Sequence, residues 1–156
     1  MDILFLTITY AGGYNIIGLL TFLTIISFYL HRQRSLIVPI ILSVGGSAIS
    51  VYILKYLFDA PRPLGASLYL ELTPSFPSGH AAFAIAFYGF LIYAIWSADH
   101  HVLKHKSILM LGLLIFAICI SRLYLGVHYP IDVLFGFMIG LWWLLVGILV
   151  SPGSAR

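Results

Sequence analysis

Three short motifs hold the residue types that could carry out chemistry in this chain: Lys55-x6-Arg62-Pro63, then Pro77-Ser78-Gly79-His80, then Ser121-Arg122-x5-His128-x3-Asp132. Together they supply three cations, two histidines and one carboxylate, in a sequence of which only 8% is charged. A lysine ammonium is a point charge and an arginine guanidinium is a planar fork, and both suit phosphate oxygens. The motifs therefore predict a single site that binds a phosphate group.

The second and third motifs add groups that could act on that phosphate. Ser78 and Gly79 precede an apolar segment, and free backbone N–H groups at a helix amino terminus favour an anion. His128 and Asp132 are four residues apart at the start of another such segment, so the carboxylate can reach back and hold the imidazole in one tautomer. His80 supplies a second group that titrates near neutral pH. One histidine that attacks and one that donates a proton fit phosphoryl transfer through a covalent intermediate.

The composition places these motifs in a membrane. The chain has 156 residues, is 62% hydrophobic and has a mean hydropathy of +1.07, whereas soluble domains are about 45–50% apolar and about 25% charged. Spanning about 30 Å of hydrocarbon takes about 20 apolar residues. Five segments qualify: Gly13–Leu30, Ser35–Leu57, Gly79–Trp96, Ser107–Leu123 and Pro130–Val150. We expect an all-α integral membrane bundle of about five transmembrane helices in one domain, residues 1–156.

Shorter features bear on how these helices begin and pack. Met1–Ala11 is apolar but too short to cross alone, and it could be an interfacial helix or the first turns of the first span. It lacks the basic start and the cleavage site of a signal peptide. Small residues at Gly45-Gly46 and Gly136-x3-Gly140 could let helix backbones approach closely, although plain lipid-facing or kinked helix is an equal alternative.

The positive charges predict the orientation. Those outside the motifs fall on one side of five alternating spans: Arg32, Arg34, Lys104, Lys106 and Arg156. The positive-inside rule makes that side cytoplasmic. The motifs then share the opposite face, so the site is expected to face the periplasm or the exterior of the cell membrane, with the carboxyl terminus in the cytoplasm.

Other functions and sites are disfavoured. The net charge of +3 is too small and too dispersed for a nucleic-acid surface, and the lone Cys119 cannot form an internal disulfide. His100, His101 and His105 share a loop with lysines, where a solvated segment is a better explanation than a metal site. Glu71 is expected to be a solvated loop charge, with contact to a lipid head group as the alternative.

The three motifs, at this spacing and in this order, resemble the signature of the type 2 phosphatidic acid phosphatase family, which is related to the vanadium haloperoxidases. The match covers every signature position from Lys55 to Asp132. The resemblance implies that His128 is the nucleophile, that Asp132 orients it and that His80 protonates the leaving oxygen. It also implies that the phosphate and its transition state are held, without a metal or cofactor, by Lys55, Arg62, Ser78, Gly79 and Arg122.

The resemblance also implies a lipid phosphatase that works on membrane lipids. A polyprenyl diphosphate such as undecaprenyl diphosphate is the favoured substrate, while phosphatidylglycerophosphate, phosphatidate and a lipid A-type phosphate are the alternatives. A transporter or scaffold that only binds anionic lipid and a haloperoxidase are the competing classes. Family members usually have six spans, so this chain is expected to be one helix short before the first motif. A neighbour in a homo-oligomer could supply that helix.

Overall fold

The computed structural model describes residues 2–63, 71, 73–97 and 104–152, except for the side chain of Asp2. Over these residues the chain is all-α, as predicted. Six α-helices follow one another, with a single 3₁₀ turn at Arg34–Leu36: α1 (Asp2–Tyr10), α2 (Tyr14–Leu30), α3 (Ile37–Phe58), α4 (Gly79–Ser97), α5 (Lys104–Tyr124) and α6 (Pro130–Val150).

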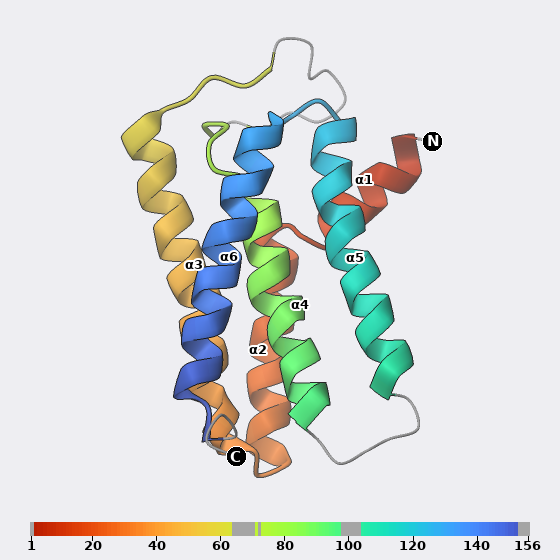
Figure 1. The fold of residues 1–156 in the computed structure, drawn as a ribbon, viewed down its shortest axis with the longest axis vertical. Helices are drawn as coiled ribbons and strands as arrows, with labels where there is room; N and C mark the ends of the chain where they lie inside the picture. Colours follow the sequence, from red (N-terminus) through yellow and green to blue (C-terminus); the bar gives the residue numbers. More distant parts are fainter. Residues whose placement is uncertain (1, 64–70, 72, 98–103, 153–156) are drawn as a thin grey trace.

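The predicted spans are confirmed to within about three residues at each end. The helices α3, α4, α5 and α6 are each long and apolar enough to cross a membrane. The fifth candidate is a bent pair, in which Ile3–Tyr10 and Tyr14–Leu30 meet at an angle of 44°. Helices α2 to α6 stand side by side with alternating direction, whereas the break between α1 and α2 lies part-way along the bundle (Figure 1).

The amino-terminal segment forms the separate short helix α1, which turns away from α2 and lies beside α5 (Figure 1). The Phe5 and Tyr124 rings stack there with centroids 4.0 Å apart. Tyr88 of α4 donates a hydrogen bond to the carbonyl of Ala11 in the break between α1 and α2 (2.8 Å). The bend is therefore held by contacts to α4 and α5. With nine residues, α1 is the shortest of the six described α-helices.

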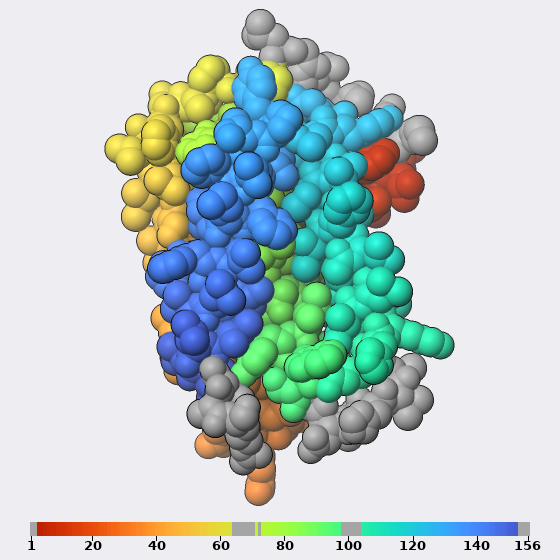
Figure 2. All heavy atoms as spheres, in the orientation of Figure 1, coloured from red at the N-terminus to blue at the C-terminus, as the bar shows by residue number. Residues whose placement is uncertain are grey.

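Helix α4 lies at the centre of the bundle, in contact with α2, α3, α5 and α6. In the space-filling view it is largely covered by the outer helices and is visible between α5 and α6 (Figure 2). The approach of α6 depends on two glycines. A Cβ at Gly136 would lie 2.3 Å from the Ser78 carbonyl oxygen, and one at Gly140 would lie 2.4 Å from that of Ala82. Because backbone cannot yield at such distances, these two glycines allow a close approach of helix backbones, which was one of the two alternatives left open by the sequence.

The other glycine pair differs from that expectation. A Cβ at Gly46 would lie 2.2 Å from the Trp143 ring, whereas one at Gly45 would have nothing within 4 Å. The indole N–H of Trp143 donates to Ser50 Oγ at 2.9 Å. Gly46 therefore makes room for a tryptophan of α6 rather than for backbone, and Gly45 makes no close approach.

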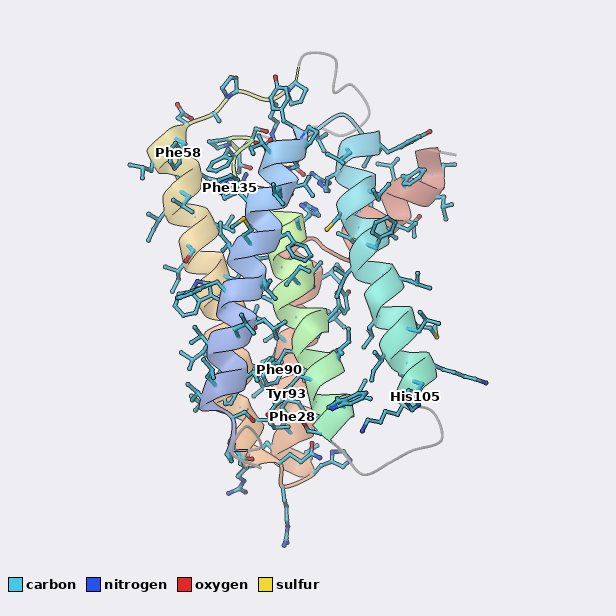
Figure 3. The ribbon with its side chains drawn as sticks, in the orientation of Figure 1. Phe28, Phe58, Phe90, Tyr93, His105 and Phe135 are labelled. Atoms are coloured by element: carbon cyan, nitrogen blue, oxygen red, sulfur yellow. The ribbon has the colours of Figure 1, made fainter. Side chains whose placement is uncertain are left out.

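The two ends of the bundle carry different residues. The turn from α2 to α3 and the start of α5 lie at the end where His105, Phe28, Phe90 and Tyr93 are seen, while Phe58 and Phe135 lie at the opposite end (Figures 1 and 3). His105 is exposed. His100, His101 and Arg156 lie outside the described residues. The end that carries Phe58 is the end at which all three motifs meet.

Candidate active site

His128 lies in the turn between α5 and α6, almost fully buried at 4% exposure. Its Nδ1 is 3.4 Å from Asp132 Oδ2 and 3.4 Å from Ser75 Oγ, and Ser75 donates a short hydrogen bond to the same carboxylate oxygen. The backbone N–H of Tyr129 also donates to Asp132 Oδ2 (2.9 Å). The carboxylate is therefore fixed from three sides. It favours the tautomer with the proton on Nδ1 and the free electron pair on Nε2.

The Nε2 atom of His128 faces the first motif, 3.4 Å from Arg62 Nη1. Burial lowers the pKa of His128 to about 4, despite the opposing effect of its contact with Asp132. The imidazole is therefore neutral near pH 7, and a neutral imidazole is the form that can attack.

Arg62 is held by the chain that leads into the second motif. Its Nε donates to the Thr73 carbonyl (2.8 Å) and its Nη1 to the Val127 carbonyl (2.8 Å). Lys55, near the end of α3, donates to the Pro74 carbonyl. Carbonyls that flank the second and the third motif thus accept hydrogen bonds from Lys55 and Arg62 of the first motif. These bonds fix the positions of the two cations.

The second motif is positioned by packing and by one backbone hydrogen bond. The Phe76 ring lies between Phe58 of α3 and Phe135 of α6, with centroids 5.1 Å from each. The Ser78 N–H donates to the Asp132 carbonyl (2.9 Å), which ties the start of α4 to the start of α6. The Ser78 hydroxyl is fully buried and has no hydrogen-bond partner among the described residues. Since buried polar groups are normally paired, this hydroxyl at a helix amino terminus is suited to bind an anion.

Arg122 lies in the last turn of α5 and is fully buried. Its Nη1 donates to Thr9 Oγ1 of α1 (2.6 Å), and its Nη2 forms an ion pair with Glu71. The short helix α1 therefore helps to place the second guanidinium of the site. In contrast, Ser121 Oγ donates to the Ile118 carbonyl (2.6 Å), which is a local contact within the helix.

Glu71 corrects an expectation from the sequence. It is not a solvated loop charge, because its Oε2 pairs with Arg62 Nη2 (2.6 Å) and its Oε1 with Arg122 Nη2. Oε1 is also 3.9 Å from His80 Nδ1. Burial raises the pKa of Glu71, but the charges of Arg122, His80 and Arg62 lower it by more, so its pKa lies below the ordinary value. The carboxylate is therefore ionised and joins three of the predicted site residues.

A cavity of about 590 Å³ opens beside these groups, between the α1–α2 break, α3 and α4. Its lining includes Lys55, Gly79, His80 and Glu71, together with tyrosines from α1, α2 and α3. Neither His128 nor Arg122 is among the lining residues. The predicted site residues thus form one connected cluster, but the buried nucleophile candidate is separated from the open cavity.

The sequence profile of the PAP2 superfamily matches residues 35–155, which include all three motifs. This chain belongs to the PAP2 superfamily. The resemblance read from the motifs is thereby confirmed.

Relatives within the family carry several names. The chain is 38% identical over 91 residues to phosphatidylglycerophosphatase B of Bacillus subtilis, covering 57% of this chain and 45% of that protein. It is 32% identical over 117 residues to the putative undecaprenyl-diphosphatase YbjG of Escherichia coli, covering 72% of this chain and 55% of that protein. The chain therefore spans about half the length of these curated relatives.

Solved structures support the fold of this PAP2 chain over nearly its whole length. A crystal structure of a transmembrane PAP2-type phosphatidylglycerolphosphate phosphatase from Bacillus subtilis superposes with a TM-score of 0.85 at 28% identity. The aligned region covers 94% of this chain and 74% of the chain in that crystal structure. Aquifex aeolicus LpxE superposes with a TM-score of 0.75, also at 28% identity, over 95% of this chain and 85% of that one. We conclude that the protein is a multi-pass integral membrane protein.

Three residues of the cluster in this PAP2 protein were not predicted from the sequence as members of the site: Thr9, Glu71 and Ser75. Ser75 lies two residues before the second motif, and this short distance along the sequence could have indicated that it belongs to the site. Glu71 was recognised only as a loop acid. Thr9 comes from a segment whose position no pattern specified. Each enters the site through a tertiary contact with a motif residue.

Proposed function

We propose that this protein is a membrane lipid phosphatase that works through a phosphohistidine formed on His128. One observation carries the proposal: a buried imidazole has its Nδ1 held by Asp132 and its Nε2 directed at Arg62 in a cluster of cations. A site that only bound anionic head groups would need the cations but not the oriented histidine. This separates the proposal from a transporter or scaffold.

In the first step, His128 Nε2 attacks the phosphorus atom while the bond from phosphorus to the lipid oxygen breaks. His80 gives a proton to that leaving oxygen. Lys55, Arg62, Arg122 and the amino terminus of α4 at Ser78 and Gly79 stabilise the charge on the phosphoryl oxygens, which is the main catalytic task in phosphoryl transfer.

In the second step, water attacks the phosphohistidine. The now neutral His80 takes a proton from that water, the N–P bond breaks, and inorganic phosphate leaves. Asp132 stays ionised throughout and stabilises positive charge on the His128 ring. The enzyme thereby returns to its starting bonds and protonation after one turnover, and the net change is hydrolysis of the bond between phosphorus and the lipid oxygen. No cofactor is required by this scheme.

The substrate we propose first is a polyprenyl diphosphate, in keeping with relatives named undecaprenyl-diphosphatase in Escherichia coli and, at 28% identity, in Sulfolobus acidocaldarius. Phosphatidylglycerophosphate is the second candidate, favoured by the names of the curated relative and of the solved structure from Bacillus subtilis. The cavity tyrosines and the lipid-facing helices suit an acyl or prenyl chain in either case.

The test is a turnover assay with purified protein on undecaprenyl diphosphate, phosphatidylglycerophosphate, phosphatidate and a lipid A-type phosphate. We expect release of inorganic phosphate from the diphosphate at the highest kcat/KM. Orthovanadate should inhibit, because it forms a five-coordinate adduct with a histidine that resembles the transition state. Binding of all four lipids without phosphate release would refute the phosphatase.

We further propose that the site faces the exterior or the periplasm. A reporter fused after Arg156 should be cytoplasmic and one inserted within residues 65–71 should be external. The reason is that the turn from α2 to α3, which carries Arg32 and Arg34, and the start of α5 at Lys104 lie at the end opposite to the site. Enzymatic reporters that work on only one side of the membrane would measure this. Both reporters on the same side would contradict the orientation.

Ser75 should act as a positioning residue. Replacing Ser75 with alanine removes the short hydrogen bond to Asp132 and frees the carboxylate on one side. We expect kcat to fall by about 10- to 100-fold with little change in KM, since misplacement of a reacting group has effects of that order.

Ser47→Ala is the matched control, because Ser47 is also fully buried but has no hydrogen-bond partner among the described residues. It should leave kcat near the wild-type value. A Ser75→Ala enzyme with wild-type kcat would show that Asp132 needs no such support.

A further inference from the structure

We propose that Glu71 is an internal competitor that occupies the phosphate position and keeps other anions out of the site. The inference rests on the proposed function, because it takes the arginine cluster to be the substrate phosphate site. It assigns to Glu71 a role in selecting which anionic lipids bind.

The geometry places the carboxylate where a phosphate is expected. Each of its two oxygens pairs with a different motif arginine, Oε2 with Arg62 and Oε1 with Arg122. Two oxygens bridging two guanidinium groups is also how two phosphate oxygens would be held. Oε1 further lies 3.9 Å from His80 Nδ1, the group proposed to act on the leaving oxygen. The Glu71 carboxylate therefore uses the same binding partners that we assign to the substrate phosphate.

The surroundings favour occupation of the site by either the substrate or Glu71, but not by both. Glu71 lines the open cavity and also contacts Arg122, which is fully buried and does not line the cavity. His128, at 4% exposure, is closed off in the same way. A phosphate that arrives through the cavity can reach Arg122 and His128 only when the carboxylate leaves. A glutamate side chain has the rotatable bonds to do this without a change of fold.

With an internal competitor, the apparent affinity of every external anion is its intrinsic affinity multiplied by the fraction of molecules in which the site is free. If the carboxylate holds the site in about nine molecules of ten, the reduction is about tenfold. Bulk membrane lipids are phosphodiesters with one negative charge and are present in large excess. A terminal phosphate carries up to about two charges near neutral pH and so binds the cations more strongly from the start. After the same reduction it still occupies the site, whereas a singly charged diester, which starts weaker, no longer does.

The Glu71→Gln variant tests this, with inorganic phosphate as the probe. Isothermal titration calorimetry in detergent should show phosphate binding about tenfold tighter or more than in the wild type, because the amide competes poorly for two arginines. Asp59→Asn is the matched control: it removes one exposed acid from the same end of the bundle and should leave the phosphate affinity unchanged. Unchanged or weaker phosphate binding in Glu71→Gln would overturn the proposal.

A second readout uses lipid. Phosphatidylglycerol added to mixed micelles should inhibit Glu71→Gln at a mole fraction about tenfold lower than the wild type, and an equal response of the two enzymes would overturn the selective role. If Glu71→Gln does not fold, Glu71→Asp keeps the charge with a shorter reach and should also bind phosphate more tightly; unaltered affinity there counts against the proposal.

The calorimetry requires no turnover, so the two ideas fail separately. Tighter phosphate binding without hydrolysis of any lipid would support Glu71 as a competitor and refute the phosphatase activity. Lipid hydrolysis with unaltered phosphate binding would support the phosphatase activity and refute the role of Glu71 as a competitor.

Discussion

Replacing His128 with alanine should lower the rate of lipid phosphate hydrolysis by about 10⁴-fold or more. Loss of a nucleophile removes the covalent route altogether, and effects of this order follow in other enzymes that use one. The imidazole is buried against Asp132 and Ser75. Its Nε2 lies beside Arg62, at the position from which we expect the attack on phosphorus. The measurement is kcat on the best lipid of the substrate panel.

His105→Ala is the control for His128→Ala. His105 is exposed at the end of the bundle opposite to the site (Figure 3). Its replacement should leave kcat unchanged. A His128→Ala enzyme that is folded and still turns over within tenfold of the wild type would exclude His128 as the nucleophile.

Replacing His80 with alanine should have an effect that depends on the leaving group. General acid catalysis contributes about 10²–10⁴-fold, and its loss is largest when the leaving oxygen is a basic alkoxide. We therefore expect the largest loss with phosphatidate, a smaller one with a polyprenyl diphosphate, whose leaving group is itself a phosphate, and the smallest with nitrophenyl phosphate. The rates of the variant on these three substrates, each relative to wild type, measure this.

The position of His80 supports this role. Its Nδ1 lies near Glu71, its Nε2 is buried without a hydrogen-bond partner among the described residues, and it lines the open cavity. A leaving oxygen could accept a proton from either nitrogen after Glu71 is displaced. Equal losses on all three substrates would show that His80 binds phosphate rather than donating a proton.

Much of the architecture follows from hydropathy and motif spacing. Each transmembrane helix needs its own apolar run, so the ends of the spans were predictable to within about three residues. Alternating helix direction then forces the three motifs to one end, as the contact between Arg62 and His128 shows. The pairing of His128 with Asp132 was predictable because four residues at a helix start bring the two side chains together.

The remaining contacts depend on tertiary packing that local patterns do not encode. The bend of 44° between α1 and α2, and with it the placement of Thr9 beside Arg122, comes from packing on α4 and α5. Glu71 was expected to be solvated because an acid in a short polar loop usually is. It is instead drawn to the guanidinium groups of Arg62 and Arg122, of which the second is fully buried. Charge balance within the cluster would have pointed to it.

The most direct test of the account is to trap the phosphoenzyme. Wild-type, His128→Ala, His80→Ala and Asp132→Asn proteins would be mixed with a substrate labelled in its terminal phosphate, quenched without acid and mapped for phosphohistidine. We predict label on His128 in the wild type, residual label on His128 in the His80 and Asp132 variants with nitrophenyl phosphate, and none in His128→Ala. Label on His80 that persists in His128→Ala would contradict the account by reversing the two histidines.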